Sequence, residues 1–70
     1  MHLKPLSELI RIRLVMQKTS LSKSQIYKLS ASGNFPKPIR LGVSSVAWLT
    51  SEVDGWIRQR INARDTGVSV

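Results

Sequence analysis

The sequence predicts a mainly α-helical fold with a small β-hairpin wing, arranged as a winged helix-turn-helix domain. Three observations support this class: two short helical patterns separated by two residues, two short apolar runs around a Gly-Val-Ser-Ser turn, and a third helical pattern near the C-terminus. A chain of 70 residues has room for one small domain, which we expect over residues 8–64, between an N-terminal tail at 1–7 and a C-terminal tail at 65–70.

The first predicted elements are a short strand and a helix. Residues 9–12 form an apolar, partly β-branched run that is too short for a helix. Apolar spacing of i, i+3, i+4 and i+7 then predicts a helix over residues 13–19. The side chains on its core-facing side are Ile12, Val15, Met16 and Thr19.

A capping box marks the start of the second predicted helix. The Ser22 hydroxyl can accept a hydrogen bond from the Gln25 amide, while the Gln25 side chain reaches back to the Ser22 amide. We expect this helix to end near residue 32, because Gly33 tolerates the left-handed conformation that often follows a helix. Only residues 20–21 separate the two helices, so their connection must be a sharp turn.

The rest of the pattern predicts a hairpin and a third helix. Two prolines hold the approach to the hairpin extended, and strands at 39–41 and 46–49 flank its turn. Ser51 and Asp54 have the spacing of a second capping box, which places the start of the last helix there. We expect this helix to end near Arg64. Its apolar stripe consists of Val53, Trp56, Ile57 and Ile61.

The second helix divides on a helical wheel into a core face and an exposed face. Ile26 and Leu29 lie on the side expected to face the core. The opposite side combines cations, hydroxyls and one aromatic ring, as expected of a helix that docks in the major groove of DNA. These candidate DNA-binding residues are Lys23, Ser24, Tyr27 and Lys28. Two lysines also fit a merely solvated face, and the Tyr27 ring can instead pack against the hairpin.

The predicted hairpin carries two further candidate DNA-binding residues, Lys37 and Arg40. We expect both on the strand face opposite Ile39 and Leu41, directed to solvent, where they can contact the sugar-phosphate backbone. The alternative is that these cations protect an edge strand against unwanted pairing.

The two tryptophans occupy apolar-patterned positions. They can be interpreted as stacking platforms for single-stranded bases. We favour a core role, in which Trp48 from the hairpin meets Trp56 from the last helix.

Composition narrows the function classes. Eleven Lys and Arg against four Asp and Glu give a formal net charge of +7, which favours nucleic acid over acidic membranes or acidic proteins as the partner. There is no cysteine for a disulfide or a thiolate metal site, and no apolar run reaches the length of a membrane span, so we expect a cytoplasmic protein. The lone His2 and scattered acidic residues compose no catalytic set, so no enzyme activity, metal, cofactor or small-molecule ligand is expected.

Several of these segments together resemble the AlpA-type prophage regulators. The resemblance rests on Leu-Ser-Lys-Ser-Gln-Ile-Tyr at 21–27, Phe-Pro-Lys-Pro at 35–38, and the tryptophans at 48 and 56. It implies a winged helix-turn-helix DNA-binding domain related to excisionases and to the DNA-binding heads of MerR regulators. It also implies transcriptional control of genes on a prophage or other mobile element, often linked to excision.

The resemblance extends to individual site residues. Lys23, Ser24, Tyr27 and Lys28 match the recognition helix of the family, which usually has arginine in place of both lysines. Lysine keeps the charge but loses the bidentate fork that suits guanine. The family often has a basic residue at the position of Ser44 in the wing turn, which makes Ser44 a candidate DNA contact, and it usually has a glycine at the position of Ser20.

Three readings of function follow from the sequence. The first is a sequence-specific binder of double-stranded DNA that regulates transcription or assists excision, acting as a homodimer or a cooperative array because one domain covers only a short site. The second is a basic protein-interaction module, an adaptor or antirepressor, and the third is a binder of structured RNA. The tight turn before an exposed Lys-Ser-Tyr-Lys face favours the first.

Overall fold

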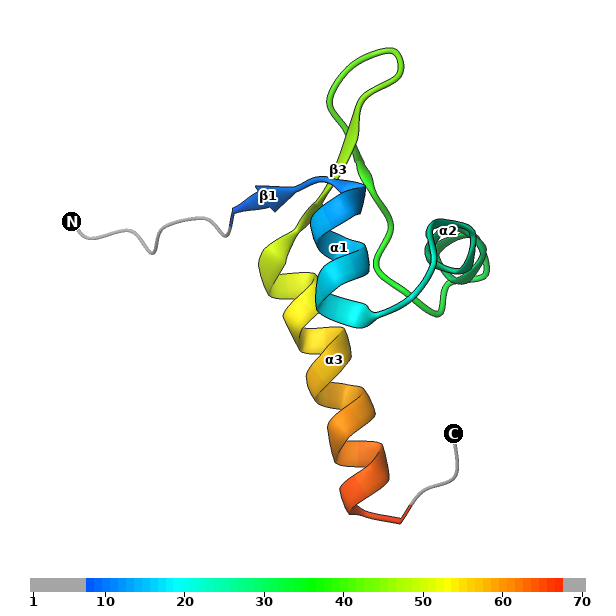
Figure 1. Ribbon diagram of the computed structural model, residues 1–70, viewed down its shortest axis with the longest axis vertical. Coiled ribbons are helices and arrows are strands. Elements are labelled where there is room, and N and C mark those ends of the chain that lie inside the picture. Colours follow the sequence, from blue (N-terminus) through cyan, green and yellow to red (C-terminus); the bar gives the residue numbers. More distant parts are fainter. Residues whose placement is uncertain (1–7, 68–70) are drawn as a thin grey trace, which may run out of the picture.

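Three helices and three short strands make up the structure, a computed structural model that describes residues 8–67 (Figure 1). The elements follow in the order β1 (Leu9–Ile10), α1 (Ile12–Thr19), α2 (Lys23–Ala31), β2 (Ile39–Arg40), β3 (Val46–Leu49) and α3 (Thr50–Asp65). This arrangement confirms the predicted fold class, mainly α with a β-hairpin wing. The expected N-terminal tail and the last three residues of the expected C-terminal tail lie outside the described residues.

The strands form one antiparallel sheet in the order β1-β3-β2. Leu9 and Ile10 of β1 pair with Leu49 and Trp48 of β3, while β2 pairs with the other edge of β3. The first predicted strand therefore joins the hairpin as a third strand. It is shorter than expected, because Ile12 already belongs to α1.

The turn between α1 and α2 is built as the sequence predicts. Ser20 ends α1 in the left-handed conformation, with φ 63° and ψ 15°, and its amide donates to the Met16 carbonyl at 2.8 Å. The capping box is confirmed, since Ser22 Oγ accepts from the Gln25 amide at 3.2 Å and Gln25 Oε1 accepts from the Ser22 amide at 2.9 Å. These bonds fix where α2 begins and how sharply the chain turns into it.

The core lies where α1, α2, β3 and α3 converge. Its largest fully buried side chains are Trp48, Ile26, Val15 and Val53, one from each of these four elements. Each predicted helix thus contributes an apolar residue from the face that its periodicity indicated. Burial of these side chains is the main stabilising term in a domain without disulfides.

The prediction of a second capping box, formed by Ser51 and Asp54, is wrong. Helix α3 begins at Thr50, with Leu49 as its N-cap and no side-chain cap, so Ser51 and Asp54 both lie inside the helix. The reason is that β3 runs directly into α3, and the Thr50 hydroxyl donates to the Glu8 carbonyl at 2.8 Å instead of leaving a loop before Ser51. The end of α3 is close to the expected one, at Asp65 rather than Arg64.

The expected contact between the two tryptophans is also wrong. The Trp48 ring meets Tyr27 with ring centroids 5.7 Å apart, and the Trp56 ring meets Phe35 at 4.9 Å. Trp48 is fully buried, as a core residue should be, whereas Trp56 is half-buried at the edge of the core. Ile61, expected on the buried stripe of α3, is 41% exposed, because the C-terminal half of α3 extends past the body of the domain (Figure 1).

Candidate nucleic-acid interface

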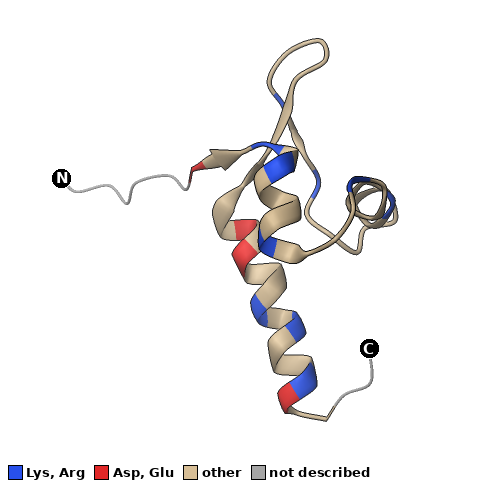
Figure 2. Cartoon of the chain, in the orientation of Figure 1, with Lys and Arg blue, Asp and Glu red and all other residues tan. Residues whose placement is uncertain are grey.

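The positive charge of the chain is concentrated in one continuous stretch. Residues 9–51 contain seven Lys and Arg and no Asp or Glu, whereas the remaining four cations are matched by four acidic residues. This stretch includes α1, α2 and the whole hairpin. Figure 2 shows the basic positions along α2 and the stem of the wing, while the acidic positions lie on α3 and before β1. The net charge therefore belongs to the helix-turn-helix and the wing.

The outer face of α2, meaning Lys23, Ser24 and Lys28, points away from the core. All three side chains are exposed. No acidic side chain within residues 8–67 is ion-paired with either lysine. Ser24 and Ala31, on the same side of α2 as the two lysines, have small side chains. A large partner can therefore approach the helix backbone closely there.

Tyr27 lies between this outer face and the wing. Its ring packs edge-on against Trp48 of β3, at an interplanar angle of 64°, and 38% of the residue stays exposed. Packing against the hairpin was one of the two alternatives for Tyr27, and the structure shows it. Tyr27 therefore lies at the border between α2 and the sheet, with part of its side chain open to solvent.

One backbone carbonyl fixes α2 relative to the wing. The Pro36 carbonyl accepts hydrogen bonds from Ser30 Oγ of α2 at 2.9 Å and from Trp48 Nε1 of β3 at 3.0 Å. Ser30 is only 4% exposed, although it was not predicted to lie on the core face of α2. On a helical wheel, Ser30 falls on the core face when that face is centred on Ile26, but not when it is centred between Ile26 and Leu29. Centring the core face on Ile26 would therefore have identified Ser30 as a buried residue.

The wing carries the other sequence-predicted site residues. Lys37, Arg40 and Ser44 are all exposed. Arg40 Nη1 donates to the Val43 carbonyl at 3.2 Å, which holds the guanidinium close to the wing turn. Val43 itself is 96% exposed, so an apolar side chain stands at the tip beside Ser44.

The expected alternation of solvent-directed cations and covered apolar side chains along the wing is wrong in one respect. Ile39 and Leu41 are exposed as well as Arg40, because the hairpin projects beyond the helices and none of the elements within residues 8–67 covers its second face (Figure 1). Lys37 lies before β2, between two prolines, so the pleat of the strand does not set its direction. Its exposure comes from its place on the path between α2 and the wing.

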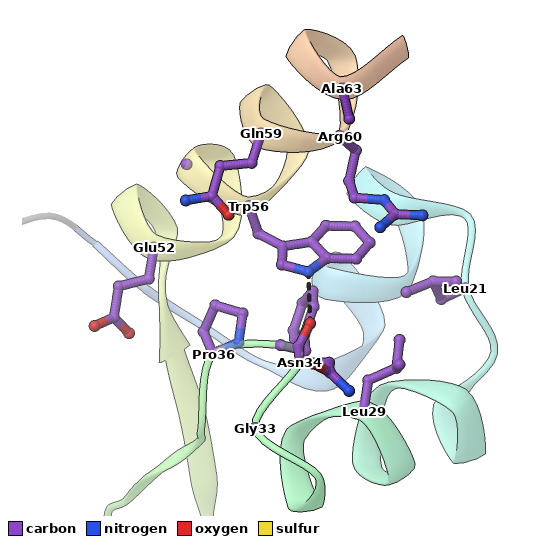
Figure 3. Close-up of a pocket in the computed structure, with 12 residues that line it drawn as sticks. Leu21, Leu29, Gly33, Asn34, Pro36, Glu52, Trp56, Gln59, Arg60 and Ala63 are labelled. Carbon is purple, nitrogen blue, oxygen red and sulfur yellow. Dashed lines mark hydrogen bonds between the residues drawn. The ribbon is translucent and has the colours of Figure 1, made fainter. Parts of the chain in front are cut away.

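An open groove of about 900 Å³ lies on the other side of α2, between that helix and α3 (Figure 3). The Trp56 ring forms its floor, and Trp56 Nε1 donates to the Asn34 carbonyl at 2.8 Å. Leu29 of α2 and Arg60 of α3 line opposite sides. The two tryptophan N–H groups thus hold the loop after α2 at two points, the carbonyls of Asn34 and Pro36.

Residues 8–67 contain neither a cluster of metal-ligating side chains nor a helix fit to span a membrane. No group of three or more His, Asp or Glu side chains in this part of the chain lies close enough to hold a metal ion. None of the helices there has both the length and the apolar character needed to cross a membrane.

Comparison with known proteins places the chain in a family. The sequence profile of the family described as prophage CP4-57 regulatory protein (AlpA) matches residues 8–61. The chain belongs to this AlpA family. The match covers both helices of the helix-turn-helix, the wing and most of α3.

Two relatives are similar to this chain over 58 residues each. A phage P4 protein, "Uncharacterized protein ORF88", is 45% identical, and the match covers 83% of this chain but just under two thirds, 66%, of the phage protein. "DNA-binding transcriptional activator AlpA" of Escherichia coli K12 is 36% identical, with coverage of 74% of this chain and 83% of that protein. The AlpA resemblance seen in the sequence is therefore confirmed at the level of the family.

Proposed function

We propose that this AlpA-family protein is a sequence-specific binder of double-stranded DNA that regulates transcription from a prophage or other mobile element. The observation that carries the proposal is the outer face of α2, which presents two lysines that have no ion pair within residues 8–67 and which is joined to a basic wing through the Pro36 carbonyl. The similarity to a protein named as a DNA-binding transcriptional activator supports the same class. The proposal involves no catalytic step and no cofactor.

In this proposal α2 enters the major groove. Lys23 and Lys28 reach phosphates or base edges, while the low surface at Ser24 lets the helix approach the bases. Tyr27 adds an exposed ring edge on the side of the wing. Because lysine lacks the planar fork of arginine, base readout by this face relies on single hydrogen bonds rather than bidentate pairs.

The wing supplies contacts to the sugar-phosphate backbone. Lys37 and Arg40 are the charged groups for this role, and Ser44 offers a hydroxyl at the turn. Phosphate contacts of this kind set the register of the protein on the duplex without reading sequence themselves.

The protein is expected to occupy its site as a homodimer or a cooperative array. One domain of this size covers a short stretch of duplex, and a short stretch gives too little discrimination against the rest of a genome. Sedimentation of the protein with duplexes carrying one or two copies of the site measures the stoichiometry directly. A role in excision of the element is the finer form of the same proposal, and loss of excision in a strain lacking the gene would support it.

The proposal is tested by Lys28→Ala, with Arg58→Gln on α3 as the charge-matched control. Both substitutions remove one exposed cation, but only Lys28 lies on the outer face of α2. Fluorescence anisotropy with the duplex upstream of the gene should show weaker binding for Lys28→Ala and unchanged binding for Arg58→Gln. Equal binding by both variants would contradict the assignment of α2. Preference for a structured RNA or an acidic protein over the duplex would favour one of the other two readings.

A further inference from the structure

Helix α2 has two flanks, and the proposed contacts occupy one of them. On the wing flank, the Tyr27 ring meets Trp48 of β3. On the opposite flank, Leu29 lines the open groove shared with α3 (Figure 3). A helix with its side chains is about 10–12 Å wide and the major groove of DNA is about 12 Å wide, so a docked helix has a phosphate backbone on each side. The flank away from the wing therefore also faces a phosphate strand.

Arg60 is the cation placed on that second flank. Its guanidinium carbon lies 5.6 Å from the centroid of the Trp56 ring, and in Figure 3 the side chain extends over the ring towards Leu21 of the helix-turn-helix turn. The ring is itself fixed by the Trp56 hydrogen bond to Asn34 and by packing on Phe35. The contact with the ring thus restricts the orientations of Arg60 while the side chain remains exposed, which lowers the entropy lost when it binds.

The other cations near this flank already have carboxylate partners. Lys18 Nζ lies 2.9 Å from Asp54 Oδ1, and Arg64 Nη2 lies 2.9 Å from Asp65 Oδ1. Arg60 has no ion pair with a carboxylate of residues 8–67, so its charge is available. Glu52 lines the same groove but lies at the end away from Arg60 (Figure 3).

We infer that Arg60 contacts a DNA phosphate on the side of α2 opposite the wing, so that the recognition helix is bracketed by cations from two separate elements. This inference rests on the proposed function, since it assumes that α2 docks in the major groove. It adds a residue of α3 to an interface otherwise formed by residues 23–44. The contact is to the backbone, and it increases affinity for every sequence alike.

The test compares Arg60→Gln with Arg58→Gln in the full chain. The two arginines are two positions apart on α3, about 200° around the helix axis, and Arg58 does not line the groove. Anisotropy is measured on the upstream duplex and on a scrambled duplex over a series of salt concentrations. Circular dichroism melting of each variant checks the fold.

Arg60→Gln should lower the slope of log affinity against log salt by about 0.9 on both duplexes, which corresponds to roughly an eightfold loss of affinity at 0.1 M salt. Arg58→Gln should leave both slopes unchanged. Identical slopes for the two variants, with wild-type binding intact, would overturn the Arg60 contact alone. Failure of the wild-type chain to bind either duplex would overturn the proposed function and this inference together.

Discussion

The two faces of α2 differ in how they are built. The inner face places Ile26 in the core and ties Ser30 through the Pro36 carbonyl to Trp48 of the sheet. The outer face carries Lys23 and Lys28 with no ion pair to the acidic residues of 8–67. Stability and proposed function are therefore separated on one nine-residue helix. Substitutions on the inner face should change the free energy of unfolding, and those on the outer face should change DNA binding.

The largest expected effect on stability is at Trp48 of β3, which shares the Pro36 carbonyl with Ser30 of α2. Trp48→Ala removes a fully buried indole and should destabilise the domain by about 3–5 kcal/mol. A domain of this size has only about 4–10 kcal/mol in total, so thermal melting should show a chain largely unfolded at 37 °C. Trp48→Phe, which keeps most of the ring volume but loses the N–H donor, should melt between this variant and wild type. A cooperative, wild-type-like melt for Trp48→Ala would contradict the account of the core.

A matched pair of serines compares the two faces directly. Ser30→Ala removes one of the two donors to the Pro36 carbonyl and should cost about 1 kcal/mol. Ser24→Ala is the same substitution on the outer face and should change stability by less than about 0.5 kcal/mol. Urea unfolding of both variants measures the difference. If Ser24→Ala proved the more destabilising, the orientation of α2 would be wrong.

The turn between α1 and α2 offers a gain of stability. Ser20 adopts φ 63°, a conformation that costs a residue with a Cβ atom about 1–2 kcal/mol. Ser20→Gly should therefore stabilise the domain by about 0.5–1 kcal/mol after the greater freedom of glycine in the unfolded chain is subtracted. Gly33→Ala, at φ 83° in the loop after α2, is the opposite change and should lower the melting temperature. A lower melting temperature for Ser20→Gly would contradict the assigned backbone conformation.

The smallest expected effect on stability is at the outer face. Lys28→Ala removes an exposed side chain that has no carboxylate partner among residues 8–67, and it should shift the free energy of unfolding by less than about 0.5 kcal/mol. Chemical denaturation measures Lys28→Ala beside Ser30→Ala. Lys28→Ala should bind DNA more weakly than Ser30→Ala and yet be the more stable of the two. A loss of stability equal to that of Ser30→Ala would show that the two roles are not separated.

Local signals in the sequence predicted the helix-turn-helix well. The capping box at Ser22 and the apolar spacing around Val15 both depend on neighbours within four residues. The structure confirms each of them for that reason. The exposure of the candidate residues on α2 was likewise predictable from the helical period.

Contacts between distant elements were not predictable in the same way. The Ser51 capping box failed because a longer-range bond from Thr50 to Glu8 helps to start α3 two residues earlier, with Leu49 as the N-cap. Ser30 was missed because its partner, the Pro36 carbonyl, is positioned by the loop rather than by the helix. The two tryptophans have the apolar pattern of core residues, but the pattern does not say that one meets Tyr27 and the other Phe35.

The central proposal is that this chain recognises a specific sequence of double-stranded DNA. The measurement that tests it most directly is anisotropy of the wild-type protein on the duplex upstream of its gene and on a scrambled duplex, over a salt series. The account predicts tighter binding to the upstream duplex that persists as salt rises, with a log–log slope that indicates several phosphate contacts. Equal and steeply salt-dependent binding to both duplexes would contradict it, because that result describes a basic protein on a polyanion and no recognition of sequence.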